Sequence, residues 1–192
     1  SSLHYGHMPL VVAPGTWSRW NKPKETALKE RSHGDGILVG ADSAEALEEP
    51  FWRLRTEAGY VQDDVLEPHR VSAEDHAAYL DFQGLVRENG KVYLAKNNNA
   101  LLRYPALRSH NKDFRVVLMY REPLAHAASL LAMHQRYTAM QSEDPFVKIY
   151  MDWLAHHEFG LGHKPFRFDA GTSRTSGSTS DPDTLEYWLD RW

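Results

Sequence analysis

Short apolar runs alternate along this chain with longer segments in which apolar residues recur every three or four positions. The runs lie at residues 8–14, 91–97 and 114–121, and each has the length of a strand. In the last run, Val116, Val117 and Leu118 are consecutive, which is typical of a strand covered on both faces. The pattern therefore predicts an α/β fold with a short parallel sheet flanked by helices.

Helix start signals precede two of the intervening segments. Asp42 stands three positions before Glu45, and Ser72 three before Asp75, which is the spacing of a capping box. Gly90 is a natural end for the second helix. We expect helices over about residues 46–59 and 76–90.

The C-terminal third predicts one more packed helix, a loop and a final helix. Residues 143–160 place four apolar side chains on one stripe, which indicates core packing, and Gly160 ends this helix. Residues 169–183 are rich in Ser, Thr and Gly and predict a loop. Ser180 or Asp181 is expected to cap the last helix, with Pro182 in its first turn. The four residues on the stripe are Phe146, Tyr150, Trp153 and Leu154.

Composition restricts the class of protein further. With 192 residues, 42% of them hydrophobic, the chain is expected to form one domain over residues 1–192. A net charge of −4 argues against nucleic acid as a partner, and no run approaches the roughly 18 apolar residues of a membrane span. The absence of cysteine excludes disulfides and fits a cytoplasmic protein. Because the chain begins at Ser1 and ends within a helical pattern, we expect it to be part of a longer protein.

Candidate anion-binding chemistry follows the third run. Arg121 ends this run, Pro123 is suited to the first turn of a helix, and Ser129 follows on that helix. A guanidinium and the amino end of a helix both attract phosphate groups. The alternative is a surface ion pair of Arg121 with Glu122 or another neighbour, and a hydrogen bond of Ser129 to a carbonyl within its own helix.

A second cation stands at the end of the preceding run. Lys96 lies near the end of the run at residues 91–97. Neighbouring parallel strands bring their last residues to the same edge of a sheet. We therefore expect Lys96 and Arg121 to lie near each other.

The stretch from Lys96 to Ser129 resembles the sulfotransferases that use 3′-phosphoadenosine-5′-phosphosulfate. In that family a strand ends in Arg-Asp-Pro or a close variant, and a Ser follows on the next helix at the spacing found here between Arg121 and Ser129. Residues 35–53 and 150–160 also resemble bacterial members. The family's first loop, of the type Lys/Arg-Ser/Ala-Gly-Thr, has no counterpart; the nearest string contains Gly15 and Thr16 without a preceding basic residue.

The resemblance implies a three-layer fold like that of the P-loop nucleotide-binding proteins, incomplete at its N-terminus. It implies that Arg121 and Ser129 bind the 3′-phosphate of the donor, and that Lys96 stabilises the leaving group during sulfuryl transfer. The acceptor is an unidentified hydroxyl or amine of a small molecule or carbohydrate. The six Trp and nine Tyr residues suit a carbohydrate or lipid-like acceptor, but core packing is favoured for Trp52, Trp153 and Trp188. Alternatives are a non-catalytic nucleotide-binding or interaction module of the same fold and, ranking below it, a phosphotransferase.

The sequence does not single out one residue as the catalytic base. His33, Asp35, His110 and His134 all have suitable chemistry, and a structural or solvent-facing role is favoured for His134. Metal binding is not expected, because the histidines between 156 and 163 lack the helical i, i+4 spacing of a zinc pair and the family needs no metal.

Overall fold

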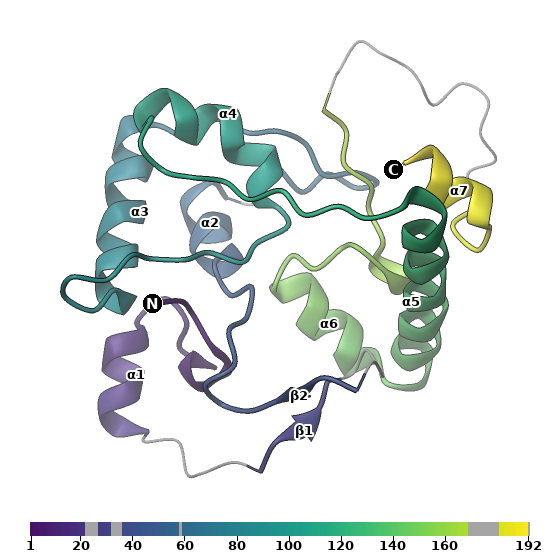
Figure 1. Ribbon diagram of the computed structural model, residues 1–192, viewed down its shortest axis with the longest axis horizontal. Helices are drawn as coiled ribbons and strands as arrows, with labels where there is room; N and C mark the ends of the chain where they lie inside the picture. Colours follow the sequence, from purple (N-terminus) through teal and green to yellow (C-terminus); the bar gives the residue numbers. More distant parts are fainter. Residues whose placement is uncertain (22–26, 32–35, 58, 169–180, 192) are drawn as a thin grey trace. The chain divides into compact units, whose positions relative to one another are not determined.

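The computed structural model describes residues 1–192 except 22–26, 32–35, 58, 169–180 and 192. The described chain is mostly helical and carries a small two-stranded antiparallel sheet (Figure 1). It divides into two compact units, residues 1–60 with 69–111 and residues 61–68 with 112–192, which are described separately. The prediction of one domain over residues 1–192 stays a prediction.

The first unit is built on two longer helices, α3 and α4, two shorter ones, α1 and α2, and an aromatic core. Phe51 and Phe82 stack with ring centroids 4.8 Å apart, and Trp52 is fully buried beside Tyr79. In the sheet, Lys29 pairs with Val39. The elements of this unit are η1 (Tyr5–His7), α1 (Pro14–Trp20), β1 (Lys29–Glu30), β2 (Leu38–Val39), α2 (Glu49–Arg55), α3 (Ala73–Val86) and α4 (Ala100–His110).

One of the two predicted capping boxes is confirmed. The Ser72 hydroxyl accepts a hydrogen bond from the Asp75 amide at 3.0 Å, while the Asp75 carboxylate accepts from the Ser72 amide at 3.3 Å, so α3 begins as predicted. The other prediction is wrong, because α2 begins only at Glu49 and Glu45 makes different contacts. Both helices are shorter than predicted, and Gly90 lies beyond the end of α3.

The second unit is organised around the longest helix. Ala127 is fully buried and forms a core with Tyr187 and Trp188, which are each 4% exposed. Figure 1 shows α7 lying beside α5. The elements are α5 (Pro123–Glu143), α6 (Pro145–Trp153), η2 (Gly160–Gly162) and α7 (Leu185–Asp190).

Helix boundaries near the C-terminus differ from the prediction. The Asp144 carboxylate accepts from the Phe146 amide and caps α6, which ends at Trp153 instead of Gly160. The predicted stripe is only partly buried, since Phe146 is 65% exposed. Thr184 caps α7; of the two predicted cap residues, Asp181 lies in the preceding turn and Ser180 lies outside the described residues.

The predicted parallel sheet does not appear in the described part of the chain. Residues 8–14, 91–97 and 114–121 contain no strand, and parallel pairing is limited to an isolated bridge between Leu66 and Phe166. A strand requires a neighbour for its backbone groups. Residues 115–120 form no ladder bonds with any described residue, and Val117 is 85% exposed. The prediction of strands in these runs is therefore not met within the described residues, because none of these residues pairs with the backbone of 115–120.

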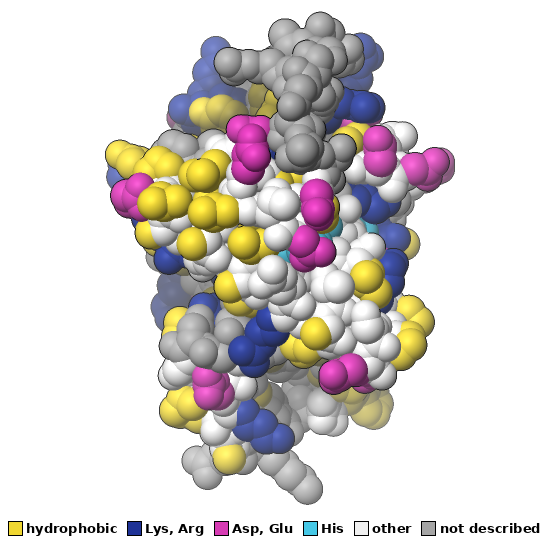
Figure 2. All heavy atoms as spheres, turned by 90° about the vertical axis from the view of Figure 1, so that its right-hand side faces the viewer, with side chains coloured by type: hydrophobic (Ala, Val, Ile, Leu, Met, Phe, Trp, Pro, Cys, Tyr) yellow, Lys and Arg dark blue, Asp and Glu magenta, His cyan; other side chains and the backbone are white. Residues whose placement is uncertain are grey.

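On the face shown in Figure 2, hydrophobic side chains are interspersed with acidic and basic ones. Among the described residues, none of the helices combines the length and the apolar character needed to cross a membrane.

Candidate functional site

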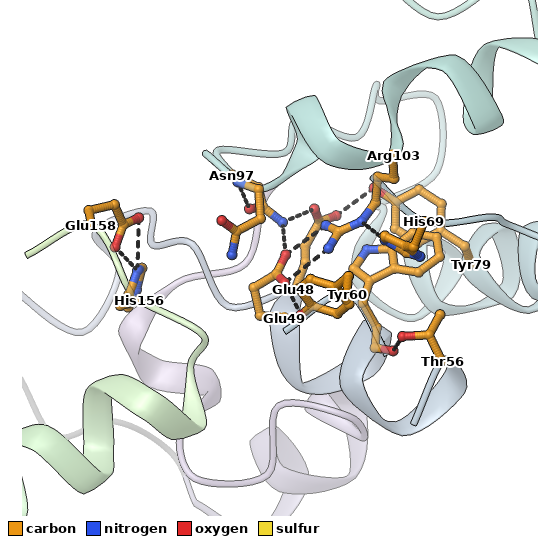
Figure 3. A network of polar contacts seen from close by, with 12 residues as sticks. Glu48, Glu49, Thr56, Tyr60, His69, Tyr79, Asn97, Arg103, His156 and Glu158 are labelled. Carbon is orange, nitrogen blue, oxygen red and sulfur yellow. Dashed lines mark hydrogen bonds and ion pairs between the residues drawn. The ribbon is translucent and has the colours of Figure 1, made fainter. Parts of the chain in front are cut away.

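The most extensive polar network of the first unit surrounds two adjacent glutamates at the start of α2 (Figure 3). The Arg103 guanidinium, from α4, donates to both carboxylate oxygens of Glu49 at 2.6 and 3.0 Å, and both side chains are 1% exposed. The Tyr60 hydroxyl also donates to Glu49. Burial acts to raise the pKa of Glu49, but the charge and hydrogen bonds of Arg103 outweigh it, so the pKa of Glu49 is lowered.

Glu48 has a different environment, although it is the neighbouring residue. Its carboxylate accepts from the hydroxyls of Tyr79 and Tyr93 at 2.7 and 2.8 Å and from the Asn97 amide at 3.3 Å. Burial raises the pKa of Glu48, because these hydrogen bonds and the charge of Arg103 do not fully replace the lost hydration. Two neighbouring carboxyl groups thus have pKa values shifted in opposite directions.

Arg103 is enclosed by aromatic rings as well as by carboxylates. Its guanidinium lies 4.8 Å from the ring centroid of Trp52 and 5.3 Å from that of Tyr60. Its Nε donates to Nε2 of His69 at 3.1 Å, which requires this nitrogen to be unprotonated. Burial, followed by the charge of Arg103, lowers the pKa of His69 to about 4. The interior of the unit is therefore held by a desolvated cation with a fixed set of partners.

This network anchors the segment that carries Lys96. Tyr93 and Asn97 flank the lysine, and both bind the buried glutamates; the Asn97 amide donates to Glu49 at 2.6 Å. Lys96 itself points to the surface with its side chain 56% exposed, and its Nζ lies 3.5 Å from Oε1 of Glu45. The exposed ammonium of Lys96 is thus carried by a backbone segment whose neighbouring residues bind the buried glutamates, and it lies beside the Glu45 carboxylate.

The start of α5, in the second unit, corrects one expectation. Pro123 occupies the first turn as predicted, but the Glu122 carboxylate accepts from the amides of Leu124 and Ala125 at 3.0 and 2.6 Å. These hydrogen bonds lower the pKa of Glu122. The amides expected to attract an external anion are therefore occupied by the chain's own carboxylate.

Arg121 and Ser129 are both accessible at this end of α5. Arg121 is exposed and, within the described residues, has no ion pair, so the alternative of a pair with Glu122 is not realised. Ser129 is half-buried, and none of the described groups forms a hydrogen bond with its hydroxyl. Charge from Arg121 contributes, after burial, to lowering the pKa of His126 on the same helix. Arg121 and Ser129 could therefore both contact a bound anion without breaking an existing bond.

Lys96 belongs to the first unit and Arg121 to the second. Their predicted proximity stays a prediction. Of the four candidate bases, His33 and Asp35 lie outside the described residues. The exposed His110 has its Nε2 atom 2.8 Å from the Val71 carbonyl, and the buried His134 accepts from the Gly160 amide at 3.2 Å, so each has a local partner.

The histidines near the end of α6 also have local structural partners. His156 lies 3.4 Å from the Glu158 carboxylate, and His157 Nδ1 lies 2.8 Å from the Gly162 carbonyl. His163 bridges the His157 carbonyl and the Tyr187 hydroxyl. Within the part of the chain that the structure describes, these side chains form no metal-binding group.

Comparison with known proteins does not identify a relative of this chain. No family model, curated protein or solved structure matches the chain. The assignment of function therefore depends on the residues and their geometry.

The site contains residues that the sequence reasoning did not identify. The sequence pattern assigns Glu45 to a capping box, places Glu48 and Glu49 within the helix expected over residues 46–59, and does not single out Arg103. One available signal was the presence of Glu48 and Glu49 directly before the apolar residues Pro50 to Trp52, because charged residues inside an apolar stretch require buried partners.

Proposed function

We propose that this chain is part of a sulfotransferase that uses 3′-phosphoadenosine-5′-phosphosulfate and transfers its sulfuryl group to a hydroxyl or amine, acting in the cytoplasm. The observation that carries the proposal is the pair formed by Arg121 and Ser129. Arg121 precedes α5 with an exposed guanidinium, and Ser129 lies within α5 at the spacing of the family's 3′-phosphate motif. Among the residues that the structure describes, Arg121 has no ion pair and the Ser129 hydroxyl has no hydrogen-bond partner. Both groups are donors suited to a phosphate.

In the proposed reaction an acceptor oxygen or nitrogen attacks sulfur, and the bond from sulfur to the bridging oxygen of the 5′-phosphate breaks. Adenosine 3′,5′-bisphosphate leaves, and a base takes the proton of the acceptor. Lys96 stabilises the negative charge that develops on the bridging oxygen, and its exposed ammonium beside Glu45 supports this role. Arg121 and Ser129 select the donor, because an ordinary adenine nucleotide has no 3′-phosphate.

The proposal includes a parallel sheet to which residues 91–97 and 114–121 contribute, and a phosphosulfate-binding loop that this sequence does not contain. The exposed apolar side chains of residues 116–120 support the parallel sheet, since a run of this composition is stable when its backbone is paired and its side chains are covered.

A second candidate function is a nucleotide-binding module without catalysis. The missing loop favours a module without catalysis, and the occupation of the α5 amides by Glu122 favours an interaction module over a nucleotide-binding one. A phosphotransferase ranks below both, because the sequence has no Gly-x-x-x-x-Gly-Lys-Ser/Thr motif.

Calorimetric titration of the chain with adenosine 3′,5′-bisphosphate and with adenosine 5′-monophosphate tests the assignment. We expect the bisphosphate to bind at least about tenfold more tightly, which corresponds to about 1.4 kcal/mol. Equal affinities would overturn the 3′-phosphate assignment. A preference for the bisphosphate without release of sulfate from the donor would favour the non-catalytic module.

A further inference from the structure

The ammonium of Lys96 lies beside a carboxylate that is itself held in place. Glu45 Oε1 accepts from the Ala46 amide at 2.8 Å and lies 3.5 Å from Lys96 Nζ. Glu45 Oε2 accepts from the Tyr5 hydroxyl at 2.5 Å. The side chain of Glu45 is 17% exposed, whereas that of Lys96 is 56% exposed. The carboxylate is thus the fixed member of the pair.

Backbone hydrogen bonds hold both Glu45 and Tyr5, whose hydroxyl orients the Glu45 carboxylate. Residues 3–5 run antiparallel to residues 43–45, with a bridge between His4 and Ala44. The Glu45 amide donates to the Leu3 carbonyl at 3.1 Å, and the Tyr5 amide donates to the Ser43 carbonyl at 3.2 Å. Tyr5 therefore lies opposite Ser43 and Glu45 opposite Leu3, so Tyr5 and Glu45 are diagonal neighbours in a short two-stranded frame that does not include Lys96.

The backbone around Lys96 is held separately, by contacts of its neighbours with the buried glutamates. Tyr93 and Asn97, three positions before Lys96 and one after it, bind Glu48 and Glu49. Only the four-carbon stem of Lys96 is left to move, and its ammonium has three donors, of which Glu45 engages one. Two donors stay available for an anionic ligand.

We propose that Glu45, oriented by Tyr5, is a positioning residue that holds the Lys96 ammonium where a bound sulfuryl donor meets it. The inference rests on the proposed function. A lysine that is ordered before the donor binds loses less conformational freedom in the transition state. Glu45 does not act as the base, because its two oxygens already accept from Tyr5, Ala46 and Lys96.

A double-mutant cycle on the whole chain tests the coupling. The reaction is release of inorganic sulfate from 3′-phosphoadenosine-5′-phosphosulfate, with water as acceptor: the water oxygen attacks sulfur, the bridging bond breaks, and the proton passes to solvent. We expect Glu45→Gln to lower the rate about tenfold and Tyr5→Phe about threefold, with the affinity for adenosine 3′,5′-bisphosphate changed less than about twofold. In the Lys96→Ala background, Glu45→Gln should have no further effect.

Glu88→Gln is the matched control, because Glu88 is an exposed glutamate whose partner is also a lysine, Lys91, at 2.9 Å. This variant should release sulfate at the wild-type rate. The inference is overturned if Glu45→Gln behaves like Glu88→Gln, or if its effect is the same with and without Lys96, since a merely structural role would persist in both backgrounds.

A second readout does not depend on activity. Brief acetylation of lysines followed by peptide mass spectrometry measures the reactivity of Lys96, with Lys91 as internal reference. We expect Glu45→Gln to increase modification of Lys96 severalfold and to leave Lys91 unchanged. If the wild-type chain neither prefers the bisphosphate nor releases sulfate, the proposed function fails; unchanged labelling of Lys96 would overturn the inference about Glu45 by itself.

Discussion

Arg103 and Glu49 form a bidentate ion pair, with hydrogen bonds of 2.6 and 3.0 Å, although 54 residues separate them in the chain. Each side chain is 1% exposed. The pair joins the start of α2 to the middle of α4, and through Asn97 it also holds the segment that carries Lys96. The same contact therefore stabilises the first unit and places its candidate functional lysine.

Removal of one member of this pair should be strongly destabilising. Arg103→Ala leaves the Glu49 carboxylate buried without its counter-charge, for which we expect a loss of about 3–5 kcal/mol in the free energy of unfolding. Urea denaturation monitored by circular dichroism measures the change. Lys91→Ala, which breaks the exposed pair with Glu88, is the control and should have little effect. Similar midpoints for the two variants would contradict the importance of the buried pair.

Glu48 and Glu49 should give opposite dependences of stability on pH. The pKa of Glu48 is raised by burial, so the stability that it contributes when protonated is present below about pH 4.5 and is lost as the pH rises through its folded-state value. The pKa of Glu49 is lowered, despite burial, by Arg103, so its contribution is present above about pH 4.5 and is lost as the pH falls.

Urea unfolding of the wild type, Glu48→Gln and Glu49→Gln between pH 3.5 and about 8 tests this prediction. The wild type should lose stability relative to Glu48→Gln as the pH rises, and should gain it relative to Glu49→Gln. Parallel curves for the two variants would show that the two carboxyl groups do not differ in the folded state.

His163 predicts acid sensitivity of the second unit. Burial lowers the pKa of His163 from 6.5 to about 4, although its bond to the His157 carbonyl opposes the shift; the charges of His134 and Arg191 act with burial. Because the unfolded chain binds the proton first, stability should fall as the pH decreases from 6.5 to 4, by about 3 kcal/mol from this group.

His163→Gln removes the titrating group and should flatten this part of the pH profile. Hydrogen exchange of residues 185–190 provides a local readout, since His163 lies 2.7 Å from the Tyr187 hydroxyl of α7. If wild type and variant lose protection of α7 in parallel on acidification, His163 is not the group responsible.

The features that could be predicted from sequence are those determined locally. Ser72 with Asp75 and Pro123 mark helix starts because a cap involves residues within one turn. The contact of Arg103 with Glu49 could not be predicted, because the two residues are distant in sequence and no periodic pattern connects them. Residues 114–121 have strand composition, but strand formation also depends on a neighbour, and a residue pattern does not supply one.

Gly160 should tolerate no side chain. Its φ is +78°, and an added Cβ would clash with the Gln141 Oε1 atom, which accepts from the Leu161 amide. We expect Gly160→Ala to lower the free energy of unfolding by about 2–4 kcal/mol. Gly84→Ala is the control, because Gly84 lies within α3 with open space around it, and alanine there should stabilise by up to about 1 kcal/mol. Equal thermal midpoints for the two variants would contradict the steric argument.

Arg121 and Ser129 should determine selectivity for a 3′-phosphate and not general affinity for nucleotides. Arg121→Ala and Ser129→Ala each remove a donor to this phosphate, so each should reduce the preference for adenosine 3′,5′-bisphosphate over adenosine 5′-monophosphate by about 1–3 kcal/mol. Arg136→Ala removes an exposed guanidinium from the same helix and should leave the preference unchanged. Calorimetry with both nucleotides separates the outcomes, because an equal loss of affinity for both in Arg121→Ala would place the guanidinium at a phosphate that they share.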